Sequence, residues 1–191
     1  MDEQRPDITS ATSNILVSDA IGLRPILISD HKQLWDLMTN VYPKAYAHLW
    51  EDDGSWYQNH IWNMADVERE LNDVNASYYF VTFQQKEIGI LRIVENADFV
   101  DRPSDKALKL HRLYLDDTAQ GKGIGKAMMT WVEAYARKTD HDGVWLEVMD
   151  TKTQALKFYE RCGYHITSDF RLDFTNMHAH FRGMHKMYKA L

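Results

Sequence analysis

The chain has 191 residues, a length typical of a single domain with its own hydrophobic core. Hydrophobic residues make up 45% and charged residues 26%, which excludes a disordered or collagen-like chain. Lys and Arg number 22 against 28 Asp and Glu, a net charge of −6, whereas a duplex DNA binder usually carries a basic surplus. We therefore expect no nucleic-acid partner, and an acidic chain suits a cationic small molecule better.

A single cysteine, Cys162, excludes an intramolecular disulfide and favours a reducing compartment. No run approaches the roughly 20 apolar residues that a membrane helix needs. Residues 1–10 lack the cationic-then-apolar layout of a signal peptide. We expect a cytoplasmic protein with no membrane partner, in which residues 1–20 form a polar leader and residues 21–191 form one domain.

Apolar periodicity predicts a mixed α/β domain. The predicted strands are Ile21–Ile28, Ser77–Phe83, Ile88–Val94, Ala107–Leu115, Val144–Met149, Ile166–Phe174 and Phe181–Tyr188. Helical spacing is found at 34–41, 65–71, 124–135 and 151–162, and Pro43 is predicted to end the first of these helices or to begin the next. Gly163 stands where a left-handed residue would end the last helix.

The segment Gln120-Gly121-Lys122-Gly123-Ile124-Gly125-Lys126-Ala127 joins a predicted strand to an amphipathic helix. Alternate glycines permit positive φ angles, so that consecutive N–H groups can converge on one anion at the positive end of the helix dipole. Lys122 and Lys126 add positive charge. A tight turn that needs glycine only for packing is the simpler alternative, but the strand, the helix and the lysines together favour a phosphate site.

Two other phosphate motifs fit less well. A P-loop needs four residues between its glycines and then Lys-Ser/Thr, whereas only three residues separate Gly121 from Gly125, and Ala127 follows Lys126. A dinucleotide site needs a βαβ unit and an acid about 20 residues further on. Glu147 is crudely placed for that role, but a hairpin precedes the turn and the glycine spacing differs. Both motifs stay minor alternatives.

The sequence resembles the GNAT superfamily of acyl-CoA-dependent N-acyltransferases. Leu113-Tyr114-Leu115 followed by Gln120–Ala127 matches the family's Gln/Arg-x-x-Gly-x-Gly/Ala signature with its preceding strand. Ala155-Leu156-Lys157-Phe158-Tyr159-Glu160-Arg161-Cys162-Gly163-Tyr164 matches its second signature, Ala-x-x-Phe-Tyr-x-x-x-Gly-Phe/Tyr. The resemblance spans about residues 21–191.

The resemblance implies a single mixed, mostly antiparallel sheet, flanked by helices and splayed between its fourth and fifth strands, Ala107–Leu115 and Val144–Met149. It also implies acetyl-CoA as cosubstrate, no metal, and direct attack by a primary amine in a ternary complex. The pantetheine arm would pair with the backbone of Leu113 and Leu115. The pyrophosphate would bind the amides of Gln120, Gly121, Lys122, Gly123, Ile124, Gly125 and Lys126.

For catalysis, the resemblance makes Tyr159 the general acid that protonates the leaving thiolate; a buried aromatic on an amphipathic helix is the alternative. His111 lies where many relatives carry a glutamate base, and an imidazole with a pKa near 6.5 could relay a proton. A histidine that merely fills a strand face is as good an interpretation, and Glu147 or water are the other candidate bases. Cys162, near a helix C-terminus, is a poor nucleophile.

The acceptor is less well defined. The family places its acceptor wall after the first strand, here Tyr42–Trp62, whose aromatic and acidic residues would suit an amine or a polyamine. An amphipathic helical hairpin with a solvated acidic turn, Glu51–Asp53, is the preferred alternative. The family's second motif usually carries asparagine where this chain has Lys152, so contacts at that end of the site stay open.

The sequence leaves three further possibilities. His178, His180 and His185 lack the partners of a zinc site and are expected at the surface. The closing strands could pair with a second subunit in a homodimer. The main functional alternative to an N-acetyltransferase is a catalytically silent sensor that binds acyl-CoA.

Overall fold

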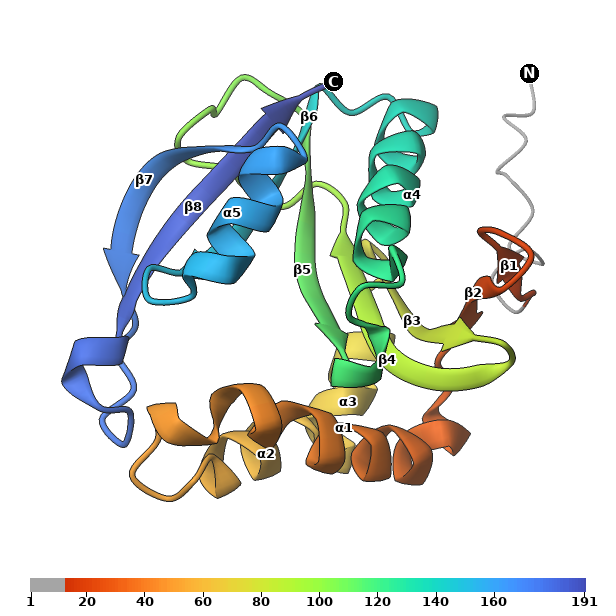
Figure 1. Ribbon diagram of the computed structural model, residues 1–191. Helices are drawn as coiled ribbons and strands as arrows, with labels where there is room; N and C mark the ends of the chain where they lie inside the picture. Colours follow the sequence, from red (N-terminus) through yellow and green to blue (C-terminus); the bar gives the residue numbers. More distant parts are fainter. Residues whose placement is uncertain (1–12) are drawn as a thin grey trace.

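A computed structural model describes residues 13–191, so the first twelve residues of the predicted leader lie outside the described part (Figure 1). Eight strands form one mixed sheet in the order β1-β2-β3-β4-β5-β6-β8-β7. Their bounds are β1 Ile15–Leu16, β2 Ile21–Pro25, β3 Ala76–Phe83, β4 Lys86–Val94, β5 Ala107–Leu115, β6 Gly143–Met149, β7 His165–Arg171 and β8 Gly183–Ala190. Thus part of the predicted leader is a short edge strand that pairs with β2.

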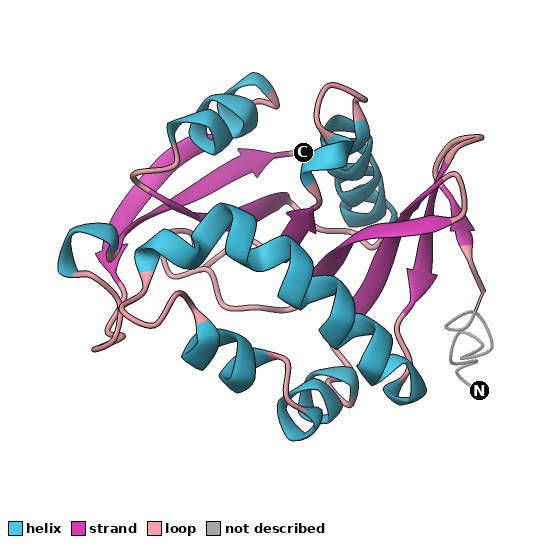
Figure 2. Ribbon diagram, turned by 60° about the horizontal axis from the view of Figure 1, so that its bottom comes forward, coloured by secondary structure: helices cyan, strands magenta, loops and turns pink. Residues whose placement is uncertain are grey.

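Helices cover both faces of this sheet (Figures 1 and 2). The helices are α1 His31–Tyr46, α2 Ser55–Ile61, α3 Met64–Leu71, α4 Ile124–Lys138 and α5 Thr153–Arg161. One apolar core joins the sheet to α4 and α5, and a second joins its other face to α1, α2 and α3. Successive side chains of β3 point to opposite faces of the sheet, so Val81 packs in the first core and Phe80 in the second.

Several boundaries differ from the sequence prediction, and two of these differences lie at proline. β2 ends at Pro25 rather than Ile28, since proline has no N–H to continue the ladder. Pro43 lies inside the last turn of α1 and does not end it. The helix loses one backbone hydrogen bond there, while buried Val41 and Tyr42 keep that turn packed in the second core.

The sheet opens between β5 and β6, the one parallel pair of strands within residues 13–191. Pairing runs from Ala107–Gly143 to Leu110–Leu146 and stops there, although both strands continue. β6 then stays with β8, and β5 stays with β4. Beyond Leu110 the backbone of β5 therefore has a strand on one side only, which is the splay that the family resemblance implies.

An irregularity in β5 aligns the residues on either side of this opening. Arg92 of β4 pairs with Arg112, but the next residue of β4, Ile93, pairs with Leu110, so His111 is an extra residue in β5. Leu108 and Leu110 face the first core, and Leu113 and Leu115 beyond the bulge pack against the same core. In a regular strand of the same residues, without the bulge, Leu113 and Leu115 would point to the opposite face.

Candidate active site

The glycine turn between β5 and α4 forms a cradle of free backbone groups. Gly121 and Gly123 have φ angles of 71° and 73°, and Gly123 is the left-handed N-cap of α4. A Cβ on either glycine would meet nothing within 4 Å, so their backbone faces open space. Within residues 13–191, the N–H groups of Ile124, Gly125 and Lys126 donate to no protein acceptor. This arrangement suits an anion.

A cavity of about 500 Å³, which we call the cofactor cavity, extends from this cradle to the gap between β5 and α5. Eight of the nine cofactor-binding residues predicted from the sequence line it: Leu113, Leu115, Gln120, Gly121, Gly123, Ile124, Gly125 and Lys126. Lys122 does not line it, and its ammonium lies 5.2 Å from the centre of the Phe83 ring instead. The predicted cradle residues therefore come together, apart from one lysine side chain.

Helix α5 forms the opposite wall of the cofactor cavity. Ala155, Phe158 and Tyr159 line it from one helical face, as their spacing of three and four residues dictates. Phe158 closes on the cradle, because a Cβ at Gly125 would lie 3.3 Å from its ring. Arg161 also lines this cavity, as a cation that sequence analysis did not single out. In the sequence, only the position of Arg161 within the second family signature pointed to a place near the site.

A second cavity of about 350 Å³, the acceptor cavity, lies on the other side of the opening. Aromatic rings make up much of its wall: Tyr42, Tyr46, Trp50, Tyr57, Tyr114, Tyr159 and Phe174. Several of these rings contact one another, for example Tyr42 and Tyr57, which stack with centroids 5.0 Å apart. Five residues line both cavities: Tyr46, Leu113, Lys152, Ala155 and Tyr159. These five define the junction, where the two cavities meet.

Two phenols lie at the junction. Burial raises the pKa of Tyr159 well above its ordinary value, with smaller contributions from Tyr46 and Cys162. Burial also raises the pKa of Tyr46, to about 12. Both hydroxyls therefore stay protonated at neutral pH and can donate. Among the described residues none gives the Tyr159 hydroxyl a hydrogen bond.

His111 lies in the acceptor cavity wall among cations. The guanidinium of Arg92 lies beside it, with Nη1 of Arg92 2.6 Å from Nδ1 of His111. Burial, followed by the positive charges of neighbouring residues with Arg112 first, lowers the pKa of His111 to about 2. The ring is therefore neutral, with Nδ1 accepting from Arg92 and the proton on Nε2. A neutral ring that is so hard to protonate is a donor here and a weak base.

Glu147, the other candidate base, lines the same cavity from β6. It lies one residue beyond the last β5–β6 pair, so its side chain enters the opening from the face that carries α1. Its Oε2 accepts from Nζ of Lys109 at 3.1 Å, and that ammonium also lies 4.3 Å from the centre of the Trp145 ring. The pair places a carboxylate in the wall of the acceptor cavity, on the face of the sheet opposite α5.

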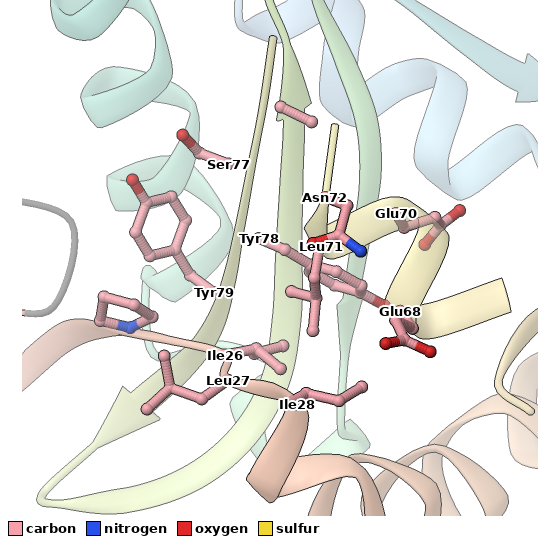
Figure 3. Close-up of a pocket in the computed structure, with 12 residues that line it drawn as sticks. Ile26, Leu27, Ile28, Glu68, Glu70, Leu71, Asn72, Ser77, Tyr78 and Tyr79 are labelled. Carbon is pink, nitrogen blue, oxygen red and sulfur yellow. The ribbon is translucent and has the colours of Figure 1, made fainter. Parts of the chain in front are cut away.

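A buried ion cluster supports the cavity floor from α3. Arg112 donates to both carboxylate oxygens of Glu70, at 2.5 and 2.8 Å. Arg92 donates to Asp73 at 3.3 Å, so its guanidinium joins this acid to His111. Glu70 also borders a third cavity of about 390 Å³, between α3, β3 and the segment after β2 (Figure 3). That cavity shares no lining residue with the other two.

The acidic turn predicted as a candidate amine binder lies outside the acceptor cavity. Glu51, Asp52 and Asp53 are exposed and line neither of the two joined cavities. Asp52 instead accepts from the backbone N–H groups of Gly54 and Trp56, so it caps the start of α2. The preferred alternative from the sequence, a solvated turn between helices, therefore describes this segment.

Lys152 crosses the junction from the start of α5. Its Nζ donates to the backbone oxygen of Ala45 at 2.5 Å and lies 4.8 Å from the centre of the Tyr46 ring. Burial lowers its pKa. No carboxylate in residues 13–191 pairs with it. At the position where the resemblance implies asparagine, this chain thus places a half-buried cation between the two cavities.

Of the three histidines considered for a zinc site, His178 and His180 lie between β7 and β8, and His185 lies in β8. His178 and His180 stack with centroids 5.9 Å apart, whereas His185 lies 2.6 Å from Asp169. No three His, Cys, Asp or Glu side chains of the described chain form a group that could hold a metal ion. Burial raises the pKa of the Cys162 thiol. In residues 13–191 no helix has the length and apolarity needed to cross a membrane.

Known proteins share both the sequence pattern and the fold. The human N-acetyltransferase 8B is 25% identical over 105 residues, which cover 53% of this chain and 44% of that protein. The chain thus spans less than half the length of this curated relative.

Two solved structures superpose over most of the chain. The PaiA N-acetyltransferase from Thermoplasma acidophilum, in complex with coenzyme A, has a TM-score of 0.69 at 18% identity and covers 90% of this chain and 99% of its own. A spermidine N-acetyltransferase from Vibrio cholerae, in complex with CoA and spermine, has a TM-score of 0.65 at 16% identity, with 91% and 96% covered. At these identities the likeness is one of fold. The model of the acetyltransferase (GNAT) family matches residues 33–164, and the chain belongs to that family.

Proposed function

We propose that this protein transfers the acetyl group of acetyl-CoA to a primary amine of a small molecule. The observation that carries the proposal is the meeting of the cofactor and acceptor cavities at Tyr159; the glycine cradle lines the first cavity, and Glu147 lines the second. A sheet that parts between β5 and β6 gives the two substrates access to one point from opposite sides.

The cofactor cavity has the chemistry that coenzyme A requires. A pyrophosphate carries negative charge and many acceptor oxygens, and the cradle offers free N–H groups at the positive end of α4. Lys126 and Arg161 add cations to the same cavity. The apolar side chains of Leu113 and Leu115 line the path from the cradle to the junction, which suits a long, mostly uncharged arm.

The reaction makes an amide and releases a thiol. The amine nitrogen attacks the thioester carbonyl, the C–N bond forms, and the C–S bond breaks. The attacking nitrogen must lose a proton, and the thiolate must gain one. We assign the second task to Tyr159, because its phenol stays protonated and lies at the junction.

We assign the first task to Glu147, directly or through a water molecule. His111 was the first candidate from the sequence, but its Nδ1 accepts from Arg92 and its Nε2 carries the proton, so the ring offers no free lone pair to the amine. Glu147 lines the same cavity, and a nitrogen that has begun to bond to carbon becomes a much stronger acid than a free ammonium. A carboxylate can therefore accept its proton at that stage.

For the acceptor, we propose an amine attached to an apolar or aromatic body, since aromatic rings line that cavity. A polyamine is a second candidate, because a spermidine N-acetyltransferase has a similar fold. The carboxylates that would bind its additional charges, those of Glu51–Asp53, lie outside the cavity. This observation ranks the polyamine lower. A reducing compartment such as the cytoplasm suits the free thiol of Cys162.

The test is a thiol-release assay with acetyl-CoA and a panel of aromatic amines, amino acids and spermidine. Release that depends on the amine supports the transferase, and a Tyr159→Phe variant should lose most of it. Stabilisation by CoA with no turnover for any amine would favour the sensor alternative. Thermal stabilisation by ATP or NAD and none by CoA would overturn both interpretations.

A further inference from the structure

Hydrogen-bond donors dominate the polar part of the acceptor cavity. Lys152, His111 and the phenols of Tyr46 and Tyr57 all present N–H or O–H groups to it. Among the lining residues the one carboxylate is that of Glu147, which already accepts from Lys109. A ligand that fits this wall brings acceptor oxygens as well as its reacting amine.

The strongest of these donors is Lys152. An ammonium has three N–H groups, and the structure gives it one oxygen, the carbonyl of Ala45, and one ring face, that of Tyr46. The other cations beside the acceptor cavity are matched, because Arg112 pairs with Glu70 and Lys109 with Glu147. A half-buried cation without a counter-ion is costly, and an anion from the ligand would remove that cost.

His111 supplies a second, fixed donor. Because Nδ1 accepts from Arg92, the ring proton lies on Nε2, and Arg92 is itself held by Asp73. The side chain sits in the bulge of β5, close to the opening of the sheet. Its imidazole therefore lines the cavity with one N–H, on Nε2, and keeps that tautomer over a wide pH range.

We propose that the acyl acceptor is a small α-amino acid with an apolar or aromatic side chain, and that Lys152 binds its carboxylate with His111 as an additional donor. This inference rests on the proposed N-acetyltransferase activity. Lys152 lies at the junction, where the amine must also lie to reach the thioester. In an α-amino acid the amine and the carboxylate are attached to the same carbon, so both can occupy the junction together.

The remaining wall fits the side chain of such an acceptor. Trp50, Tyr57 and Phe174 contact one another at centroid distances between 4.9 and 6.1 Å and form one aromatic surface. Met177 and Met184 add flexible apolar surface to the same cavity. A second ammonium, as in a polyamine, would find no free carboxylate among these lining residues.

The experiment compares acceptors that differ only at the carboxylate. Phenylalanine, phenylalaninamide and phenethylamine are assayed with acetyl-CoA, and the same is done for the tryptophan series. We expect kcat/KM to be at least about tenfold higher for the free amino acids than for the amines that lack the carboxylate, the loss typical of one charge-assisted hydrogen bond. The amino-acid amides should have the same low kcat/KM as the amines that lack the carboxylate.

Variants of Lys152 assign the effect to its charge. Lys152→Met should lower kcat/KM about tenfold more for phenylalanine than for phenethylamine, mainly through KM. Lys152→Arg should restore much of the preference. Lys157→Met, which removes an exposed lysine from the same helix, is the matched control and should change neither substrate. Equal use of amino acid and amine by the wild type would overturn the inference, as would an equal loss for both in Lys152→Met.

Product binding separates this inference from the proposed activity. Calorimetry with the CoA complex should show N-acetylphenylalanine binding more tightly than N-acetylphenethylamine, and Lys152→Met should remove the difference. This readout needs no turnover, so a protein that proved catalytically silent would still support or contradict the carboxylate site. Equal binding of the two products would contradict it, whereas turnover of amines without any such preference would leave the transferase assignment intact.

Discussion

The guanidinium of Arg92 donates to the imidazole of His111, with 2.6 Å between Nη1 and Nδ1. Since burial and neighbouring cations lower the pKa of His111 to about 2, and an unfolded histidine titrates near 6.5, the unfolded chain binds one more proton between these values. The free energy of unfolding therefore falls as the pH drops below about 6.5. Above that pH the contribution of His111 is constant.

We predict that His111→Gln flattens this pH dependence. Urea unfolding between about pH 4.5 and 6.5 should show a slope smaller by up to about 1 kcal/mol per pH unit than in the wild type. Burial also lowers the pKa of His141, so His141→Gln provides a comparison in which the Arg92 contact is kept. Parallel curves for wild type and His111→Gln would show that the imidazole titrates normally in the folded protein.

Tyr159→Phe removes the proton donor at the junction and keeps the ring. We predict a loss of kcat of about 10² to 10⁴, the range typical of a general acid, with a change of less than about twofold in the dissociation constant of CoA. Steady-state kinetics and calorimetry measure the two quantities. Tyr79→Phe, on β3 outside both joined cavities, should behave as the wild type. An unchanged kcat would remove the acid role from Tyr159.

Gly123→Ala places a side chain on a left-handed residue of the cradle. With φ at 73°, we expect the substitution to cost about 1 to 2 kcal/mol of stability and to weaken CoA binding, because the N–H groups of the cradle must shift. Gly163→Ala is the control, since Gly163 has φ at 91° at the end of α5 and does not line the cofactor cavity. It should lose similar stability with unchanged CoA affinity. Equal affinities for CoA in both variants would contradict the cradle's role.

The ion pair of Glu70 and Arg112 holds α3 against β5. Breaking it with Glu70→Gln leaves a buried guanidinium without its counter-ion, and we predict a loss of about 3 kcal/mol in the free energy of unfolding. Replacing both Glu70 and Arg112 by Met should cost less stability than the sum of the losses for Glu70→Met and Arg112→Met measured separately. Lys32→Met, in the exposed pair with Asp36, should cost less than about 0.5 kcal/mol. Additive single changes would show that the pair is not coupled.

Local patterns were enough to predict most of the elements. β5 has the bounds that its alternation predicts, and Gly163 has the left-handed φ that its position after α5 predicts. Both features, the bounds of β5 and the φ angle of Gly163, depend on residues within the same strand or the same helical turn. The predicted splay also agrees with the pairing that stops at Leu110 and Leu146.

The environment of His111 could not be predicted in the same way. Arg92 is 19 residues away in sequence, and Glu70 is 42 residues from Arg112, so only the folded sheet brings these charges together. A sequence places a histidine on a strand and cannot assign the cations beside it. One signal was present, however. The apolar positions Leu108 and Leu110 change phase before Leu113 and Leu115, which is the pattern of a bulge at the intervening residues.

The parting of β5 from β6 also affects how the backbone is protected. Beyond Leu110 the amides of β5 that point toward β6 have no strand to bond, so their protons should exchange rapidly with deuterium in the free protein. On its β4 side the same strand is paired along its length except at the bulge residue His111, and those amides should exchange slowly. Alternate residues of β5 would then differ in their protection against hydrogen exchange. A bound thioester substrate that occupies the gap would protect the exposed amides and remove this difference.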